Sequence, residues 1–137
     1  MKKVIVLLFV ASVFISSCTK KCESGYEGSN CTTEARAKYY ATYSGTAVTN
    51  GNNASVDCII TQGTSGIHSL IVQGGLTNGV GLEAILATNN DGTFVINPQV
   101  INSSFTVSGS GLFSGNNVNV TLNYPSSVTT TFTGSHP

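Results

Sequence analysis

The sequence predicts an all-β protein, an antiparallel meander of about eight short strands. Three observations lead to this prediction. Apolar and polar residues alternate with a period of two in most segments between residues 39 and 133. Clusters of Asn, Gly and Ser separate these segments at short intervals, and no segment shows sustained helical periodicity. Short connections favour pairing between strands that are neighbours in the sequence.

The first half of this region predicts strands over 39–49, 55–62, 67–73 and 80–88. The stretch "SVDCIITQ" places Val56, Cys58 and Ile60 on one face. The turn signals "NGNN" and "GTSG" flank it. The stretch "GLEAILA" contains helix-forming residues but is short and lies between turn signals, so it is interpreted as a strand. Its inward residues would be Val80, Leu82, Ala84 and Leu86.

The second half predicts strands over 93–97, 103–113, 117–124 and 127–133. "NVNVTLNY" alternates strictly, and "SVTTTFT" aligns Val128, Thr130 and Phe132. The strand 103–113 would present one face made of Phe105, Val107, Gly109, Gly111 and Phe113.

Two architectures accommodate this meander: an up-and-down barrel or half-barrel, and a two-sheet β-sandwich. Gly109 and Gly111 favour the barrel. Both lie on the inward face of a long strand, where a missing side chain permits sharp bending or close backbone approach. Barrel closure requires such bending.

The first 17 residues, "MKKVIVLLFVASVFISS", have the order of a signal peptide. Lys2 and Lys3 form a positive start, and an apolar run follows that is too short to span a membrane. We therefore expect residues 1–17 to be a helical signal peptide that is removed.

The end of the leader, "ISSC" (Ile15–Cys18), resembles the lipobox of bacterial lipoproteins. That resemblance implies a lipid attached to Cys18, with palmitate among the acyl groups. Several acyl chains together make a stable membrane anchor. Thr19 stands where an Asp would favour inner-membrane retention in that family, so the resemblance implies the outer membrane. An ordinary secretory signal with a chance cysteine is the alternative.

Charge divides the remaining chain near residues 38 and 39. After Cys18 the chain holds four basic and six acidic residues, a net charge near −2, and all four basic residues precede Tyr39. This balance offers no basic patch for nucleic acid. We expect a tether over 18–38 and a β-domain over 39–134.

If Cys18 carries the lipid, three cysteines share an oxidising compartment. Cys22 and Cys31 bracket "ESGYEGSN", whose glycines allow a tight reversal, so we expect a disulfide between them. Closing such a loop restricts the unfolded chain by about 2.7 kcal/mol in the chain-entropy model. Cys58, between apolar strand neighbours, is expected to be a buried thiol, although a reactive or intermolecular role stays open.

The stretch from Cys22 to Cys31 resembles the last loop of an EGF-like module, without the cysteines or acidic ligands of a complete one. It is followed by Glu34, Arg36, Lys38 and Tyr39 in the pattern E-x-R-x-K-Y, and then by "YSGT" (Tyr43–Thr46). Together these resemble a group of small Gram-negative lipoproteins that carry a truncated EGF-like loop and a calycin-like, lipocalin-like β-domain. The resemblance implies an architecture and no activity.

The residues offer little for catalysis or metal binding. Asp57, His68 and Glu83 fall on separate predicted strands, and His136 is next to the chain end. The sequence contains neither the paired carboxylates that would indicate an active site nor a Cys/His cluster that would indicate a metal, and no motif indicates a cofactor. We expect a protein that is not an enzyme.

The sequence is therefore compatible with two functions. The first is a membrane-anchored, non-catalytic binding module for a small apolar or glycan ligand, with Tyr39, Tyr40 and Tyr43 as exposed aromatics at a barrel mouth. The second is a structural or interaction lipoprotein of the cell envelope without a small ligand. An interior filled by aromatic residues, Phe105 among them, favours the second function, and an open apolar cavity favours the first.

Overall fold

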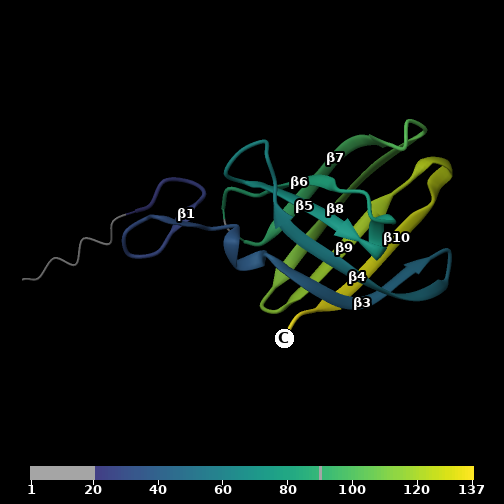
Figure 1. Ribbon diagram of the computed structural model, residues 1–137, viewed down its shortest axis with the longest axis horizontal. Coiled ribbons are helices and arrows are strands. Elements are labelled where there is room, and N and C mark those ends of the chain that lie inside the picture. The colour runs from purple at the N-terminus through teal and green to yellow at the C-terminus, as the bar shows by residue number, and fades with distance from the viewer. Residues whose placement is uncertain (1–20, 90) are drawn as a thin grey trace, which may run out of the picture.

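The computed structural model describes residues 21–89 and 91–137. The predicted signal peptide (1–17), Cys18 and Thr19 lie outside the described residues. Eight antiparallel strands close into a barrel in the order β10-β3-β4-β5-β6-β7-β8-β9 (Figure 1). The predicted all-β meander is confirmed, and closure decides against the half-barrel and the two-sheet sandwich.

The barrel strands match the predicted segments, with shifted ends. Their bounds are β3 Ala41–Thr49, β4 Asn52–Gln62, β5 Ser69–Gly74, β6 Leu82–Leu86, β7 Thr93–Ile101, β8 Phe105–Ser114, β9 Asn117–Asn123 and β10 Thr129–Ser135. Three short 3-10 turns interrupt the strands: η1 Ala37–Tyr39, η2 Gly75–Thr77 and η3 Pro125–Ser127. Two further short strands, β1 Tyr26–Glu27 and β2 Thr33–Glu34, pair with each other before the barrel begins. None of the helical segments among the described residues is long and apolar enough to cross a membrane.

Two strands are longer than predicted, for identifiable reasons. Asn50 and Gly51 both have positive φ (50° and 79°) and form a two-residue turn, so β4 begins at Asn52 rather than at residue 55. β7 continues to Ile101, beyond its predicted end at residue 97. A register shift between Ile96 and Gln99 accommodates Pro98, which has no amide hydrogen for the ladder.

The join between β6 and β7 uses a side chain in place of a backbone pair. These strands are in register at two positions, Ile85 with Val95 and Leu86 with Phe94. Further along, the Gln99 amide accepts a hydrogen bond from the amide of Glu83 at 2.9 Å and donates one to its carbonyl at 2.6 Å. One glutamine side chain thus continues the seam where the bulged strand turns away.

The barrel interior is filled with side chains. Its largest buried residues include Tyr43, Phe94, Phe132, Ile60 and Leu122. Rings stack within it: the ring centroids of Tyr39 and Phe113 are 4.2 Å apart, and those of Phe94 and Phe113 are 4.9 Å apart. The interior is therefore a packed core, as expected for an eight-stranded barrel.

The inward glycines do permit a close approach, as predicted. Gly111 lies directly opposite Phe94 on β7, and a Cβ at this glycine would overlap the Phe94 ring. A Cβ at Gly109 would overlap the carbonyl oxygen of Thr121. At each glycine, an atom of a neighbouring strand occupies the space that a side chain would fill.

The prediction that Phe105 fills the interior is wrong, since its side chain is 53% exposed. Phe105 lies on the same side of β8 as buried Val107 and Phe113. However, β9 pairs with β8 only from Ser108 onward, so the tip of the β7–β8 hairpin extends beyond the barrel wall. The alternation is correct, but there is no opposite wall for Phe105 to face.

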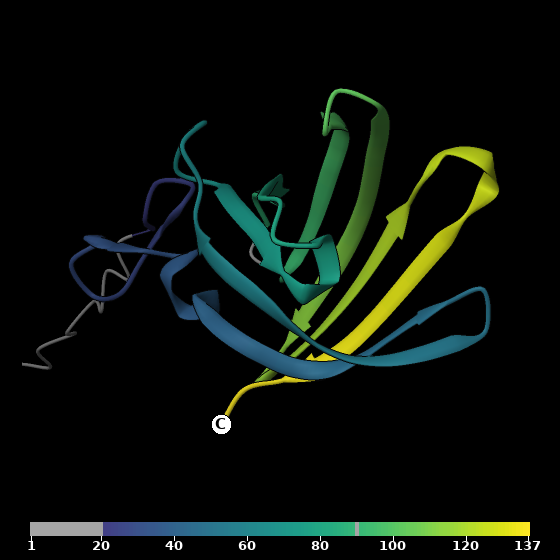
Figure 2. The same cartoon turned by 45° about the vertical axis from the view of Figure 1, so that its right-hand side comes forward.

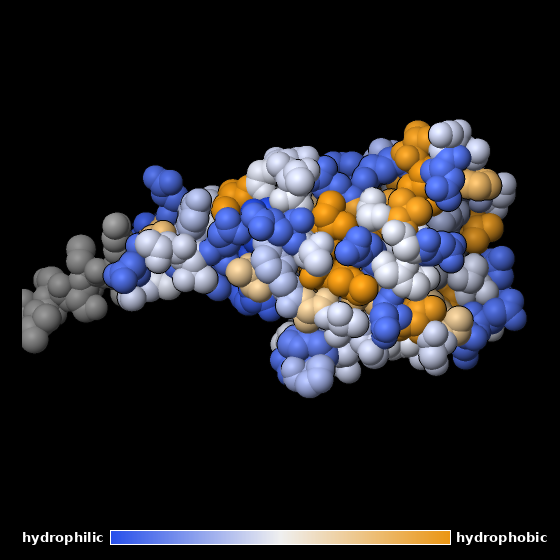
Figure 3. All heavy atoms as spheres, in the orientation of Figure 1, coloured by the Kyte–Doolittle hydropathy of each residue, from blue (hydrophilic) through white to orange (hydrophobic). Residues whose placement is uncertain are grey.

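The two ends of the barrel differ. The turn at Asn50–Gly51, the segment 75–81, the turn at Asn102–Ser103 and η3 lie at one end, which we call the distal end (Figure 2). The loops 63–68, 87–92 and 115–116 lie at the other, the proximal end, together with the segment that precedes β3. In the space-filling view, hydrophilic residues predominate around that preceding segment, and apolar residues are interspersed over the barrel (Figure 3).

Candidate functional site

Residues 21–36 form a small looped unit, the collar, that is docked on the proximal end. Cys22 and Cys31 form the predicted disulfide, with Cα atoms 5.1 Å apart. Gly25 has a φ of +92° and is buried against Ile67, where a side chain would collide. Its carbonyl accepts a hydrogen bond from the amide of Ala35 at 2.9 Å. The collar is thus packed on the barrel.

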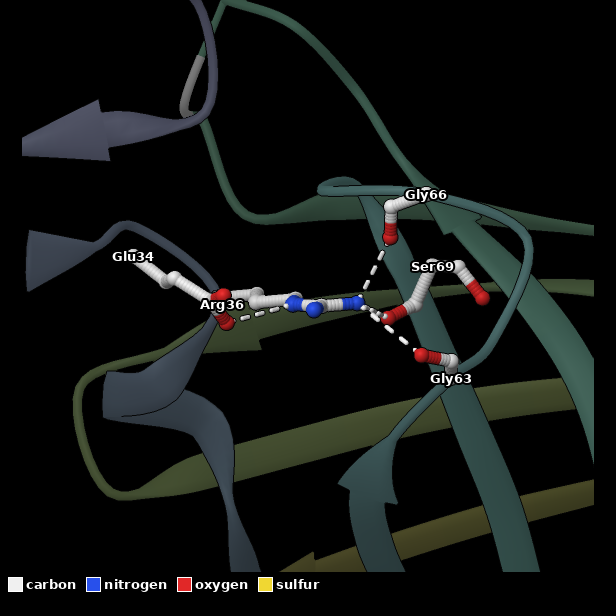
Figure 4. Close-up of polar contacts among 5 residues, drawn as sticks. All are labelled: Glu34, Arg36, Gly63, Gly66 and Ser69. Carbon is white, nitrogen blue, oxygen red and sulfur yellow. Dashed lines mark hydrogen bonds and ion pairs between the residues drawn. The ribbon is translucent and has the colours of Figure 1, made fainter.

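Arg36 joins the collar to the loop between β4 and β5 (Figure 4). Its side chain is 4% exposed. Nη1 donates to the carbonyl oxygens of Gly63 at 3.2 Å, Gly66 at 2.7 Å and Ser69 at 2.6 Å. Nε donates to Oε2 of Glu34 at 2.9 Å, which supplies the counter-charge. A buried guanidinium is tolerated because carbonyls and a carboxylate satisfy its donors.

Glu83 on β6 holds the same loop from the other side. Its carboxylate accepts hydrogen bonds from the amide of Ser65 at 3.0 Å and its hydroxyl at 2.6 Å, and from the Ser69 hydroxyl at 2.5 Å. These bonds, with those of Ser65 foremost, lower the pKa of Glu83 from 4.5 to about 2. The loop 63–68 is therefore fixed between Arg36 and Glu83.

This arrangement predicts a loss of stability in acid. The pKa of Glu83 is lower in the folded than in the unfolded chain, so its contribution is complete above pH 4.5 and is lost as pH falls toward about 2. In chemical denaturation at pH 6, 4, 3 and 2, the Glu83→Gln protein should lose less stability across this window than the parent. Identical pH profiles would contradict the assignment.

Cys58 lies in the packed interior and has no disulfide partner in the described structure. Burial raises the pKa of its thiol to about 12. The prediction that it is buried is confirmed. A thiolate, the reactive form, is scarcely populated at neutral pH under these conditions.

Cys58 is therefore expected to resist thiol reagents while the barrel is folded. In a Cys18→Ser protein at pH 8, iodoacetamide should label no thiol within an hour and one thiol after addition of guanidinium. Rapid labelling of the native protein would show that the strands around Cys58 open readily.

The candidate binding site is a hollow of about 420 Å³ at the distal mouth. The β3–β4 hairpin, the start of β10 and η2 surround it, and Thr49 Oγ1 lies 2.6 Å from Thr130 Oγ1 within its lining. None of the ten residues that line it is charged. Its apolar lining consists of Ala47, Ala54, Val56, Leu76, Tyr124 and Val128.

The hollow exists because β5 ends at Gly74, opposite Cys58, while β4 extends further toward the distal end. Ala54 and Val56 continue the inward face of β4 beyond Cys58 and Ile60, and they are small or only half-buried. After Gly74 the chain leaves the sheet and folds across the mouth, which buries Leu76 and Thr77. The hollow can therefore accommodate an uncharged apolar group without reaching the core.

The sequence did not identify this site. The segment "GGLTNGVG", which includes η2, contains no residue type that marks a binding site, and the small residues of the mouth carry no chemical signature. The three tyrosines proposed for the mouth lie elsewhere: Tyr43 is 0% and Tyr39 is 9% exposed, and Tyr40 is half-buried near Arg36. They precede or begin β3, at the proximal end and within the core.

The structure shows no hydrogen bond among the three groups considered for catalysis within the described residues. Asp57 accepts a hydrogen bond from Ser44 at 2.8 Å, Glu83 binds the serines of its loop, and His68 lies outside the strands, before β5. Within the described ranges, no cluster of three or more His, Cys, Asp or Glu side chains could hold a metal ion.

One pair has the elements of a nucleophile and a base. Ser24 Oγ lies 3.1 Å from His68 Nε2, while His68 Nδ1 is buried and has no hydrogen-bond partner in the described structure. A proton on that nitrogen would be an unsatisfied buried donor, so the favoured tautomer carries it on Nε2 and donates to Ser24. In that form the pair is a hydrogen bond between the collar and the loop 63–68.

Comparisons with protein-family models, with curated proteins and with solved structures find no match for this chain. The lipobox and EGF-like resemblances thus rest on the residues that carry them, and the barrel and the disulfide rest on the geometry.

Proposed function

We propose that this chain is a lipid-anchored protein of the cell envelope, on the outer membrane, that acts as a non-catalytic binding module through its distal mouth. The leader and the "ISSC" stretch support the anchor at Cys18. The collar, nearest the anchor in sequence, and the mouth lie at opposite ends of the barrel (Figure 1). An anchor at Cys18 would thus present the mouth away from the membrane.

One observation carries the binding proposal: the uncharged hollow between the β3–β4 hairpin, the start of β10 and η2. Ligand sites are typically concave and mainly apolar with a few polar groups, and this hollow, which Ala54 and Val56 help to line, has that composition. The packed interior supports the second candidate, a structural envelope lipoprotein without a small ligand. The packed interior also means that a binding module of this fold would have a shallow site, which receives one end or one side of its ligand.

Native mass spectrometry tests the binding proposal. Full-length Cys18→Ser protein, purified from a bacterial envelope extract without denaturation, should carry a reproducible bound species. An Ala54→Arg variant, which places a charged side chain in the hollow, should lose it, while a Ser114→Arg variant at the proximal end of β8 should retain it. Absence of any bound species in the parent would favour the structural role.

The anchor has a separate test. Palmitate labelling should require Cys18, and the parent protein should sediment with membranes while the Cys18→Ser protein does not. A Cys18→Ser protein that stays in the membrane fraction would contradict lipid attachment at this residue.

A further inference from the structure

The mouth hollow adjoins a strand edge that has no strand partner among the described residues. β4 runs from Asn52 to Gln62, but its pairing with β5 starts only at Cys58, opposite Gly74. Beyond that point β3 is the one strand that pairs with β4 in the described part of the chain, and residues 52–55 are exposed. Gly75 of η2 packs beside Val56 and Asp57, so the free edge is the part from Asn53 to Ser55.

The pairing pattern identifies the unpaired groups. Thr49 and Asn52 close the two-residue turn, so they form a hydrogen-bonded pair, and alternation makes Ala54 and Val56 the next residues bonded to β3. The amides and carbonyls of Asn53 and Ser55 must then point to the free edge. Neither residue has a hydrogen-bond partner on that side in the described part of the chain.

The outer part of this edge carries none of the usual protecting features. Natural edge strands are commonly blocked by charged side chains, proline or a bulge. From Asn52 to Val56 the strand contains none of these, and its register with β3 is continuous. The one charged residue, Asp57, lies at the inner end of the edge next to Cys58, and its carboxylate accepts a hydrogen bond from Ser44 on β3.

The edge and the hollow are two parts of one surface. The side chains of Ala54 and Val56 line the hollow, while the backbone of the residues between and beside them forms the edge. A strand placed along this edge, antiparallel to β4, would occupy the position that β5 would have taken had it continued past Gly74. Every second side chain of that strand would face the hollow.

We propose that the distal mouth binds an extended peptide segment of a partner protein, which adds to β4 at Asn53–Ser55 and places an uncharged apolar side chain in the hollow. The inference rests on the proposed function, because it specifies the ligand class of the same site. Main-chain hydrogen bonds would supply affinity, and the hollow would select the side chain.

The chemistry of the surface favours a peptide over a lipid or a glycan. Asn53 and Ser55 present amide donors and carbonyl acceptors at the two-residue repeat of a strand, which only another extended backbone matches along its length. The absence of charge in the hollow excludes acidic and basic side chains from the inward positions, because a buried unpaired charge is costly.

A peptide selection tests the inference. A phage library of random 12-residue peptides is panned on immobilised full-length Cys18→Ser protein, and the selected peptides are synthesised for calorimetry. We expect alternating sequences with uncharged apolar residues at every second position. Methylation of the backbone nitrogens that face β4 should weaken binding at least about tenfold, and methylation of the others should not.

A matched pair of variants tests the edge on the protein side. Ser55→Pro removes the edge amide and Ser55→Ala removes only the hydroxyl, so Pro should weaken binding at least about tenfold and Ala less than about twofold. Equal thermal unfolding midpoints would show that both variants fold. The peptide-methylation result does not depend on their folding.

The outcomes separate the inference from the proposed function. One outcome would overturn strand addition but leave a binding module. In that outcome Ala54→Arg abolishes the binding of a ligand and Ser55→Pro does not affect it; for a peptide ligand, methylation of the backbone nitrogens has no effect either. Failure to select any peptide would overturn the inference, whereas the proposed function fails only if native mass spectrometry also finds no bound species.

Discussion

Replacing Arg36 by alanine is expected to lower the free energy of unfolding by about 3 kcal/mol, because the buried guanidinium makes several hydrogen bonds and each hydrogen bond to a charged group contributes about 1.5 to 3 kcal/mol. The change removes the guanidinium hydrogen bonds to the carbonyls of Gly63, Gly66 and Ser69. Gly66 and Ser69 each keep a backbone amide donor, whereas Glu34 loses its counter-charge. Loss on this scale is a large part of a small domain's stability. Urea denaturation followed by circular dichroism measures it.

Two further variants make the Arg36 result specific. Arg36→Lys keeps a charge that can donate to the carbonyls but loses the Nε bond to Glu34, so it should recover part of the loss. Lys38→Ala removes an ion pair whose lysine side chain is 41% exposed, and it should change stability by less than about 1 kcal/mol. Equal effects of Arg36→Ala and Lys38→Ala would show that the buried contacts of Arg36 contribute no more to stability than a surface ion pair.

Replacing Gly111 by valine is expected to destabilise the barrel by about 3 kcal/mol, at the upper end of the range for overpacked cores. A Cβ at this position would overlap the Phe94 ring and approach the carbonyl oxygen of Asn119 to 2.6 Å. The backbone neighbour cannot move without breaking the β8–β9 ladder, so the ring must shift. Thermal and urea unfolding measure the effect.

The neighbouring residue provides the control. Ser110→Val places the same valine side chain on the exposed face of β8 and should change stability by about 0.5 kcal/mol or less. Combining Gly111→Val with Phe94→Ala should cost less than the sum of the two single changes, since the ring is what the valine displaces. Additive losses would contradict a direct overlap between the two positions.

Periodicity alone predicted most of the fold. Strict alternation in 117–124 fixed which side chains face inward, and Val118, Val120 and Leu122 are all buried. Barrel closure was favoured by two glycines, whose neighbours do occupy the space their missing side chains leave. The pattern could not place Phe105, because alternation states which face a residue is on and not whether another strand lies opposite.

The sites were less predictable for two physical reasons. Arg36 belonged to a recognisable pattern, yet its partners are backbone carbonyls, and any residue in the loop could supply those. The distal hollow arises from the point at which β5 leaves the sheet, a feature of chain path that residue types do not encode. The Cys22–Cys31 disulfide was predictable because it depends only on the short loop between the two cysteines, whose length and glycines allow the chain to reverse.

The barrel is closed by its first and last strands, since β3 pairs with β10 from Ser44–Thr49 to Thr130–Ser135. β3 lacks its second neighbour until β10 has been synthesised, so the closing contacts form only after the last strand is available. Contacts of such sequence separation form slowly because loop closure must precede them. For a chain threaded across a membrane behind a leader, as proposed here, this topology delays completion of the barrel until the last strand has crossed, and it keeps the chain in a form that can still be exported.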